Sequence, residues 1–301
     1  MASTEKQFGI DCICELFGKT RQAYYKSKKT TFKESIMEDL ILTLVRKIRE
    51  NQKRLGGRKL FKLIAPELPE AGQIGRDAFF DLLRDNGMLV RRRRLRAYTT
   101  NSFHHYHKFP NLIKEFVPDK ANQLWVSDIT YIKTDSGFVY LYLITDAYSR
   151  KIVGWSLSNT LEAKNAVEAL HVALSQLPAN IKGLIHHSDR GIQYCCTKYV
   201  NCLQEHKISI SMTEKSDPYE NAIAERVNGI LKTEWLYDMN LKNCDDAKSA
   251  VYEIIGIYNT LRPHSSIEML TPDQAHQRTG NLKRLWKTYN KKKQSELLIV
   301  N

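Results

Sequence analysis

Three acidic residues in this 301-residue sequence have the types and spacing to do chemistry. Asp128 stands inside an apolar, strand-like run, Asp189 follows the apolar run 181–185, and Glu225 lies in a segment with helical apolar spacing. A carboxylate at a strand end and another on a later helix can converge on one point. Clustered carboxylates repel one another and favour divalent cations. Two Mg²⁺ ions held about 4 Å apart could then promote an in-line displacement at phosphorus.

Each acid taken alone has a simpler explanation. An Asp inside a strand can be a buried structural residue that accepts hydrogen bonds from the backbone, because an uncompensated buried charge is costly. Asp146 and Asp217 stand in turns, where Asp is common for local hydrogen bonding. Glu234 lies nine residues past Glu225, off its helical face. We therefore expect only the first three acids to form a site.

Lys232 lies seven residues after Glu225, on the same side of the expected helix and two turns away. It is placed to hold a phosphate near the acids, although a plain surface lysine would fit the same position. A Gly-rich phosphate cradle and a nucleophilic Ser or Cys arrangement are both missing from the sequence. The acids with Lys232 therefore point to phosphoryl transfer.

The elements that must position these residues begin near residue 123. Three apolar runs rich in β-branched and aromatic residues predict an antiparallel meander, and alternating helices and strands follow it. This order is typical of a ribonuclease-H-like α/β fold with a mixed five-stranded sheet. In it the first and fourth strands are neighbours, which would bring Asp128 next to Asp189. The predicted strands are 125–132, 138–145, 152–157, 181–185 and 208–212, and the predicted helices are 161–177, 198–204 and the segment around Glu225.

The N-terminal third has the pattern of all-α, helix-turn-helix DNA-binding units. Apolar spacing at 10–17, a Gly18 break and a Thr20 cap predict two short helices. The second would place Arg21, Gln22 and Tyr24 in a major groove, although such hairpins also serve as plain packing units. A second three-helix unit is predicted at 39–87.

An arginine-rich run follows this second unit. Such a run repels itself unless phosphates neutralise it, so we expect a linker that follows the DNA backbone and makes binding steeply salt-dependent. A solvated linker is the alternative. Candidate DNA contacts over the whole chain are Arg21, Gln22, Tyr24, Arg58, Arg91, Arg92, Arg93, Arg94, Arg96, Arg190, Lys232, Arg262 and His264.

Composition supports a polyanionic partner. The formal net charge is +13, and residues 1–115 carry 24 Lys and Arg against 13 Asp and Glu. No apolar run has the length of a membrane span or the core of a signal peptide. Six cysteines in a chain of this size are not a disulfide framework, and Cys12 with Cys14 lacks the partners of a zinc site. His104, His105 and His107 are interpreted as a polar loop. We expect a cytoplasmic protein.

Asp189 and Glu225 are separated by 35 residues, with a Lys seven past the Glu. This resembles the DD(35)E pattern of retroviral-type integrases and one bacterial transposase family. Further matches are WVSDITYI at 125–132, SRKIVGW at 149–155, HHSDRGIQY at 186–194, ENAIAERVNGILKTE at 220–234 and YNTLRPHSSIEMLTPDQ at 258–274. Together they resemble the catalytic, second-frame product of the insertion-sequence-three family of transposases.

The resemblance implies that Asp128, Asp189 and Glu225 are catalytic metal ligands for two Mg²⁺ ions, which Mn²⁺ could replace. It implies that a DNA strand is cut at an element end and that the exposed 3′-OH attacks another phosphodiester. It also implies double-stranded DNA as the partner, namely the terminal inverted repeats and target DNA, and with it association with the bacterial nucleoid. A homo-oligomer, either a dimer or a tetramer, would bridge two ends, and a first-frame helix-turn-helix protein is a further possible partner.

The sequence departs from the family pattern at Val227-Asn228-Gly229, where aromatic residues are usual, and at Glu220, where Asp is usual. Two other functions stay open: a regulator that binds DNA without cutting it, and a nuclease that hydrolyses without joining. The predicted domains are 1–38, 39–100 with the Arg-rich linker, the catalytic core 101–280, and a basic tail 281–301. The tail could grip DNA or be a solvated helix.

Overall fold

The structure is a computed structural model that describes residues 10–69, 73–91, 106–179, 181–214 and 221–285, without the side chains of 11–13 and 27–34. The chain divides into two compact units: residues 1–50 with 56–90, called the helical unit here, and residues 51–55 with 91–301, called the core unit. Arg92, Arg93, Arg94, Arg96 and Asp217 lie outside the described residues, as do Glu220, the pair His104 and His105, and the tail from residue 286.

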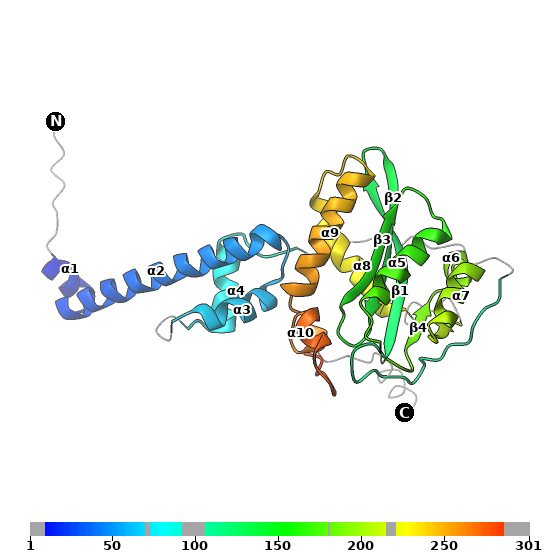
Figure 1. The fold of residues 1–301 in the computed structure, drawn as a ribbon. Helices are drawn as coiled ribbons and strands as arrows, with labels where there is room; N and C mark the ends of the chain where they lie inside the picture. The colour runs from blue at the N-terminus through cyan, green and yellow to red at the C-terminus, as the bar shows by residue number, and fades with distance from the viewer. Residues whose placement is uncertain (1–9, 70–72, 92–105, 180, 215–220, 286–301) are drawn as a thin grey trace, which may run out of the picture. The chain divides into compact units, whose positions relative to one another are not determined.

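The helical unit has the all-α character that its sequence predicts. Its buried apolar side chains include Val45, Leu60, Phe79 and Leu83. The rings of Phe61 and Phe79 lie 5.5 Å apart within it. The elements, coloured blue to cyan in Figure 1, are α1 (Ile10–Leu16), α2 (Arg21–Asn51), α3 (Gly57–Ile64), the 3₁₀ helix η1 (Ala65–Glu67) and α4 (Arg76–Asp85).

Helix α2 differs from the prediction of a short helix after Thr20 and a separate three-helix unit at 39–87. It is one helix of 31 residues that runs through the predicted domain boundary at 38. Its start agrees with the prediction, because Thr20 Oγ1 accepts a hydrogen bond from the Ala23 backbone N–H at 3.1 Å. Residues 27–38 contain neither Gly nor Pro, so nothing in this stretch ends the helix.

The core unit contains the predicted mixed sheet of five strands, in the order β3-β2-β1-β4-β5. Strands β1, β2 and β3 form the antiparallel meander, and β4 and β5 add parallel to β1. The elements are β1 (Leu124–Thr134), β2 (Gly137–Asp146), β3 (Ile152–Ser158), α5 (Ala163–Ser175), β4 (Ile185–Ser188), α6 (Ile192–Cys195), α7 (Thr197–Glu205), β5 (Ser209–Met212), α8 (Ala222–Glu234), η3 (Leu236–Asp238), α9 (Cys244–Thr260), η4 (Ser265–Ile267) and α10 (Pro272–His276).

Strand β4 corrects the prediction of a strand at 181–185. The strand starts only at Ile185, because Gly183 adopts a φ of +75° and interrupts the apolar run. It then continues into the polar residues that follow. One ring nitrogen of His186 has two polar neighbours inside the protein. His186 Nε2 lies 2.7 Å from Ser127 Oγ and 2.8 Å from Tyr199 Oη, and burial lowers the pKa of His186 to about 3.

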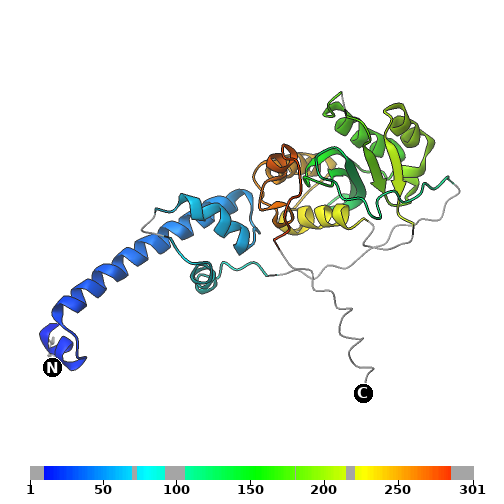
Figure 2. The same cartoon turned by 90° about the horizontal axis from the view of Figure 1, so that it is seen from below.

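Helices cover both faces of the sheet, as Figures 1 and 2 show. Helices α5 and α7 pack on one face against a cluster that contains Trp125, Tyr142 and Val153. Helices α8 and α9 pack on the other face against Leu141 and Leu143. Asp128 within β1, Asp189 just after β4 and Glu225 on α8 therefore belong to one α/β unit. Within the described part of the chain, no helix is long and apolar enough to cross a bilayer.

Candidate active site

Asp128 and Asp189 follow the last paired residues of two neighbouring strands. Strands β1 and β4 are parallel, and their register ends with Ser127 opposite Ser188. Each acid is the next residue along its chain. Parallel pairing therefore brings two carboxylates, 61 residues apart in the sequence, to the point where β4 ends beside β1.

The Asp128 carboxylate is held by two hydrogen bonds. Its Oδ1 accepts from the Ile129 backbone N–H at 2.9 Å, and its Oδ2 accepts from Asn228 Nδ2 at 2.8 Å. Burial, followed by the charge of Asp189, raises the pKa of Asp128 to about 7, and the Asn228 hydrogen bond opposes that rise. The charge of Glu225 adds a smaller increase, so all three predicted acids interact electrostatically.

Asp189 is positioned by the turn that follows it. Its Oδ1 accepts from the Gly191 backbone N–H at 2.9 Å. A Cβ on residue 191 would lie 3.0 Å from that same oxygen, so a glycine lets the loop come this close. Arg190, a predicted DNA contact, is partly buried. The pKa of Glu214 is lowered mainly by its hydrogen bond with Lys114, and the charge of Arg190 adds a small further decrease.

Helix α8 carries Glu225 on an exposed position and is tied to β1 at two points. Asn221 Nδ2 donates to the Ser127 carbonyl at 2.9 Å, and Asn228 donates to Asp128. Burial and the charge of Asp189 raise the pKa of Glu225. The two asparagines therefore set the distance between the helix acid and the strand acids.

Sequence reasoning gave Asn228 no role and noticed it only as a departure from a family pattern. A signal was present, because Asn is a poor residue for a helix interior and here lies three residues from Glu225, on the same helical face. Asn228 is 5% exposed, and its Oδ1 is a buried acceptor without a hydrogen-bond partner. That oxygen is a further polar atom beside the acids.

The chemistry of these side chains fits a divalent cation. Hard cations prefer carboxylate and amide oxygens, and a cation would relieve the repulsion that raises the pKa values of Asp128 and Glu225. Among the described residues, no three His, Cys, Asp or Glu side chains are grouped tightly enough to hold a metal ion in the present arrangement. A ligand set of Asp128, Asp189 and Glu225 therefore stays a prediction.

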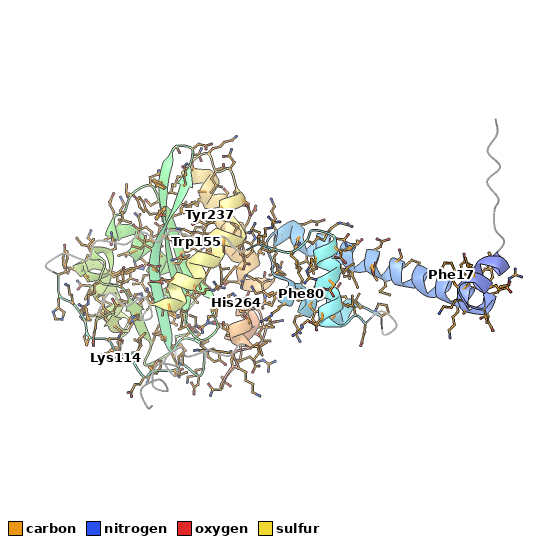
Figure 3. All side chains as sticks on the ribbon, turned by 180° about the vertical axis from the view of Figure 1, so that it is seen from behind. Phe17, Phe80, Lys114, Trp155, Tyr237 and His264 are labelled. Carbon is orange, nitrogen blue, oxygen red and sulfur yellow. The ribbon has the colours of Figure 1, made fainter. Side chains whose placement is uncertain are left out.

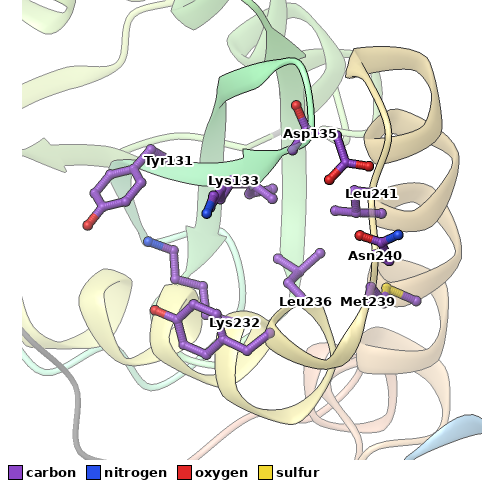
Figure 4. Close-up of a pocket in the computed structure, with 11 residues that line it drawn as sticks. Tyr131, Lys133, Asp135, Lys232, Leu236, Met239, Asn240 and Leu241 are labelled. Atoms are coloured by element: carbon purple, nitrogen blue, oxygen red, sulfur yellow. The ribbon is translucent and has the colours of Figure 1, made fainter.

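Lys232 is half-buried near these acids, and its ammonium lies 4.2 Å from the centre of the Tyr131 ring (Figure 4). Burial lowers the pKa of Lys232, whereas the charge of Asp128 raises it. The lysine and the strand acid therefore belong to one electrostatic neighbourhood, as the helical spacing predicts.

Five other predicted DNA contacts are exposed on the protein: Arg21, Gln22, Tyr24, Arg58 and Arg91. The first three lie in the first turns of α2, directly after the turn at Gly18, whose φ is +60°. This is the position that reads bases in a helix-turn-helix. Exposure is compatible with DNA contact, and the contacts themselves remain predictions.

Arg262 and His264 correct the predicted DNA surface, because both are buried in the core unit, where Figure 3 labels His264. The Arg262 side chain is 1% exposed and binds Glu234 through two hydrogen bonds, of 2.8 Å and 2.6 Å. The ring of His264 lies 5.0 Å from that of Tyr258. Both residues therefore contribute to the interior of the protein, and the bidentate pair with Glu234 compensates the charge of the buried Arg262 guanidinium. The pairing of Glu234 with Arg262 is consistent with the prediction that Glu234 lies outside the acidic site.

Comparisons with known proteins match the core unit most fully. Two family models, each described as an integrase core domain, match residues 118–218 and 206–272. The insertion element IS600 31 kDa protein of Shigella sonnei is 36% identical over 266 residues, which are 86% of this chain and 96% of that protein. Transposase InsF for insertion sequence IS3A of Escherichia coli K12 is 35% identical over 62% of this chain and 67% of its own. The HTLV-2 integrase catalytic core, solved with magnesium, matches at 20% identity with a TM-score of 0.43, over 53% of this chain and 99% of its own.

Proposed function

This chain belongs to the insertion-sequence-three family of transposases, and we propose that it binds the terminal inverted repeats of an insertion sequence, cuts a DNA strand there and joins it to another. The family makes it a DNA transposase with an integrase-type core, a polynucleotidyl transferase. The observation that carries the proposal is the register of β1 and β4, in which Asp128 and Asp189 succeed paired residues.

Asp128, Asp189 and Glu225 are the residues that would hold two Mg²⁺ ions, with Mn²⁺ as a substitute. When bound, such ions favour an in-line displacement by stabilising charge on the attacking and leaving oxygens. The pKa of Asp128, about 7, supports this assignment. Burial and neighbouring charges oppose the ionisation of this carboxyl group, and a bound cation would stabilise its ionised form.

The chain's own residues then position the strand. Asn228 holds the Asp128 carboxylate, Gly191 holds that of Asp189, and Lys232 offers an ammonium to a nearby phosphate. In the joining step, the 3′-hydroxyl oxygen bonds to phosphorus while the bond from phosphorus to the departing 3′-oxygen breaks. The hydroxyl proton passes to solvent, and the departing oxygen takes one up.

The helical unit and the Arg-rich run after it would grip the repeat, since both are basic and Arg21, Gln22 and Tyr24 are exposed. Two ends must meet for joining, so the proposed active species is a homo-oligomer, either a dimer or a tetramer. A first-frame helix-turn-helix protein is a further proposed partner.

The test uses labelled terminal-repeat DNA, Mg²⁺ and the full chain, compared with Asp189→Asn. We expect the parent to produce cut and joined strands, and Asp189→Asn to lose both while its affinity for the end stays within about threefold, because binding rests mainly on phosphate contacts elsewhere. Cut strands without joined product would identify a nuclease instead. Binding without cutting would identify a regulator, and full activity of Asp189→Asn would remove the carboxylate argument.

A further inference from the structure

A pocket lies beside the open half of strand β1. Strand β4 pairs with β1 only as far as Ser127, and among the described residues no strand continues that pairing along 128–134. The pocket has a volume of about 280 Å³ and is lined by this half of β1, by the end of α8 and by the segment 236–241. It therefore continues the edge on which Asp128 stands.

The far wall of the pocket is fixed by backbone hydrogen bonds. The N–H of Asp135 donates to the Leu241 carbonyl at 2.9 Å, and that of Ser136 donates to the Lys242 carbonyl at 3.1 Å. Leu236 and Leu241 line the pocket from the buried core and give it an apolar floor. This floor and wall are part of the fold, so the pocket needs little reorganisation to receive a ligand.

The opening of the pocket is lined by two tyrosines and a methionine that are accessible to solvent. Tyr131, Tyr237 and Met239 line the pocket and are 38%, 50% and 38% exposed. Aromatic side chains at a nucleic-acid site stack on bases, and stacking tolerates any base because every base has a π face. The exposed tyrosine rings around this cavity could therefore stack on a planar ligand.

The two ends of the pocket differ in charge. Figure 4 shows the ammonium groups of Lys133 and Lys232 on the side of Tyr131, and the carboxylate of Asp135 and the amide of Asn240 on the other side. A nucleotide has the same polarity, with an anionic phosphate at one end and a base edge that carries donors and acceptors at the other. Asp135 would repel a phosphate and accept a hydrogen bond from an exocyclic amino group.

We propose that this pocket receives one unpaired nucleotide of the DNA strand close to the reacting phosphodiester, an inference that rests on the function proposed above. Tyr131 is three residues from Asp128 and Lys232 is seven from Glu225, so the pocket lies about 10 Å from the acids along both elements. That span equals about three base steps of a stacked strand.

An unpaired nucleotide fits better than paired DNA. A duplex presents its phosphates outward, and its backbone would meet the Asp135 carboxylate, while its bases could not reach the apolar floor. A cavity of this volume is near the lower limit of about 300 Å³ for ligand pockets and suits a single base with its sugar. A base next to a strand break stacks on one neighbour only, so it leaves the helix at the lowest cost there.

The test compares the fully paired terminal-repeat duplex with eight duplexes that each carry one mismatch, at one of the four positions on either side of the cut. Competition binding to the full chain, without divalent ions, measures the affinity ratio. We expect the parent to prefer a mismatch at one position by about tenfold, because the cost of unpairing is already met there. Tyr237→Ala and Met239→Ala should reduce this preference to less than twofold.

The matched control is Tyr252→Ala, since Tyr252 is 72% exposed on α9 and does not line the pocket. It should keep the parent's preference. Equal affinity for all duplexes, or a preference that survives both pocket variants, would overturn the pocket assignment. A separate incubation of the parent with Mg²⁺ reports strand cutting, so a failure of the proposed function is seen independently of the binding ratio.

Discussion

At the residue scale, Asp128 is in an unfavourable environment that a cation would relieve. Its pKa is raised to about 7 by burial and by Asp189, while the hydrogen bond from Asn228 opposes the rise. A carboxylic acid must lose its proton to bind a divalent ion. With Asp128 as the proposed ligand, its protonation would link metal affinity, and with it activity, to pH in the neutral range.

Removing the Asn228 donor should move the acid limb of the pH–rate profile. Asn228→Ala takes away an interaction that favours the ionised form, so the pKa of Asp128 rises further and more activity is lost at low pH. The sign follows from proton competition: the variant should lose most below pH 7 and approach a constant ratio to the parent at pH 9. Strand-cutting rates from pH 6 to 9 at fixed Mg²⁺ measure this. A uniform loss at every pH would show that Asn228 acts only through the fold.

At the element scale, two interior contacts decide how the core unit holds its acids. Helix α5 approaches β3 at Gly154, where a Cβ would lie 2.3 Å from the Ala169 carbonyl oxygen. Glu234 at the end of α8 binds Arg262, which follows α9. The first contact packs a helix on the sheet, and the second ties the helix that carries Glu225 to the C-terminal segment.

Gly154→Ala should destabilise the protein by about 1–3 kcal/mol, because the clash is with backbone that cannot move without shifting the helix. Urea unfolding followed by circular dichroism measures the change. Gly256→Ala is the matched control: a Cβ there meets nothing within 4 Å inside α9, so it should be neutral or stabilising by up to about 1 kcal/mol. Equal effects of the two changes would contradict the close approach.

Arg262→Ala should lower the free energy of unfolding by about 3 kcal/mol, since it leaves Glu234 without its partner in a largely buried position. The affinity of the folded variant for DNA should stay unchanged, because the guanidinium is 1% exposed. Arg58→Ala provides the contrast, as an exposed arginine whose loss should not affect stability. Weakened DNA binding by stable, folded Arg262→Ala would restore the surface role.

At the scale of the whole molecule, the charge is distributed unevenly along the chain. The net charge is +13, and residues 1–115 hold 24 of the 46 Lys and Arg but only 13 of the 33 Asp and Glu. Asp128, Asp189 and Glu225 stand in the part that is nearly neutral. In the proposed function, such a division would let one region hold the phosphate backbone while another keeps carboxylates for cations.

Replacing Arg91, Arg92, Arg93 and Arg94 by Gln should weaken binding to all DNA sequences alike. Every arginine that no longer neutralises a phosphate reduces the slope of log affinity against log salt by about 1, so the variant should have a flatter salt dependence. Titrations at four salt concentrations with terminal-repeat and scrambled duplexes measure both effects. A weakening restricted to the terminal repeat would show that these arginines read bases.

Much of the core unit could be predicted from its sequence. The hydrophobic patterns near Asp128 and Glu225 indicated the meander, the strand order and the neighbouring placement of β1 and β4, because alternation and helical spacing are local consequences of which face is buried. The charge distribution and the motif around Asp189 indicated the class of partner and reaction. These properties depend on residue types and spacing alone.

Tertiary structure decided what depends on partners distant in the chain. His186 is accommodated inside β4 because Ser127 and Tyr199 lie within hydrogen-bond distance of its Nε2, and Arg262 is buried because Glu234 lies opposite. Asn228 acquires its role only when α8 lies across β1. The sequence pattern around a polar side chain is the same whether that side chain contacts solvent, DNA or a buried partner. Only the tertiary structure determines which of these it contacts.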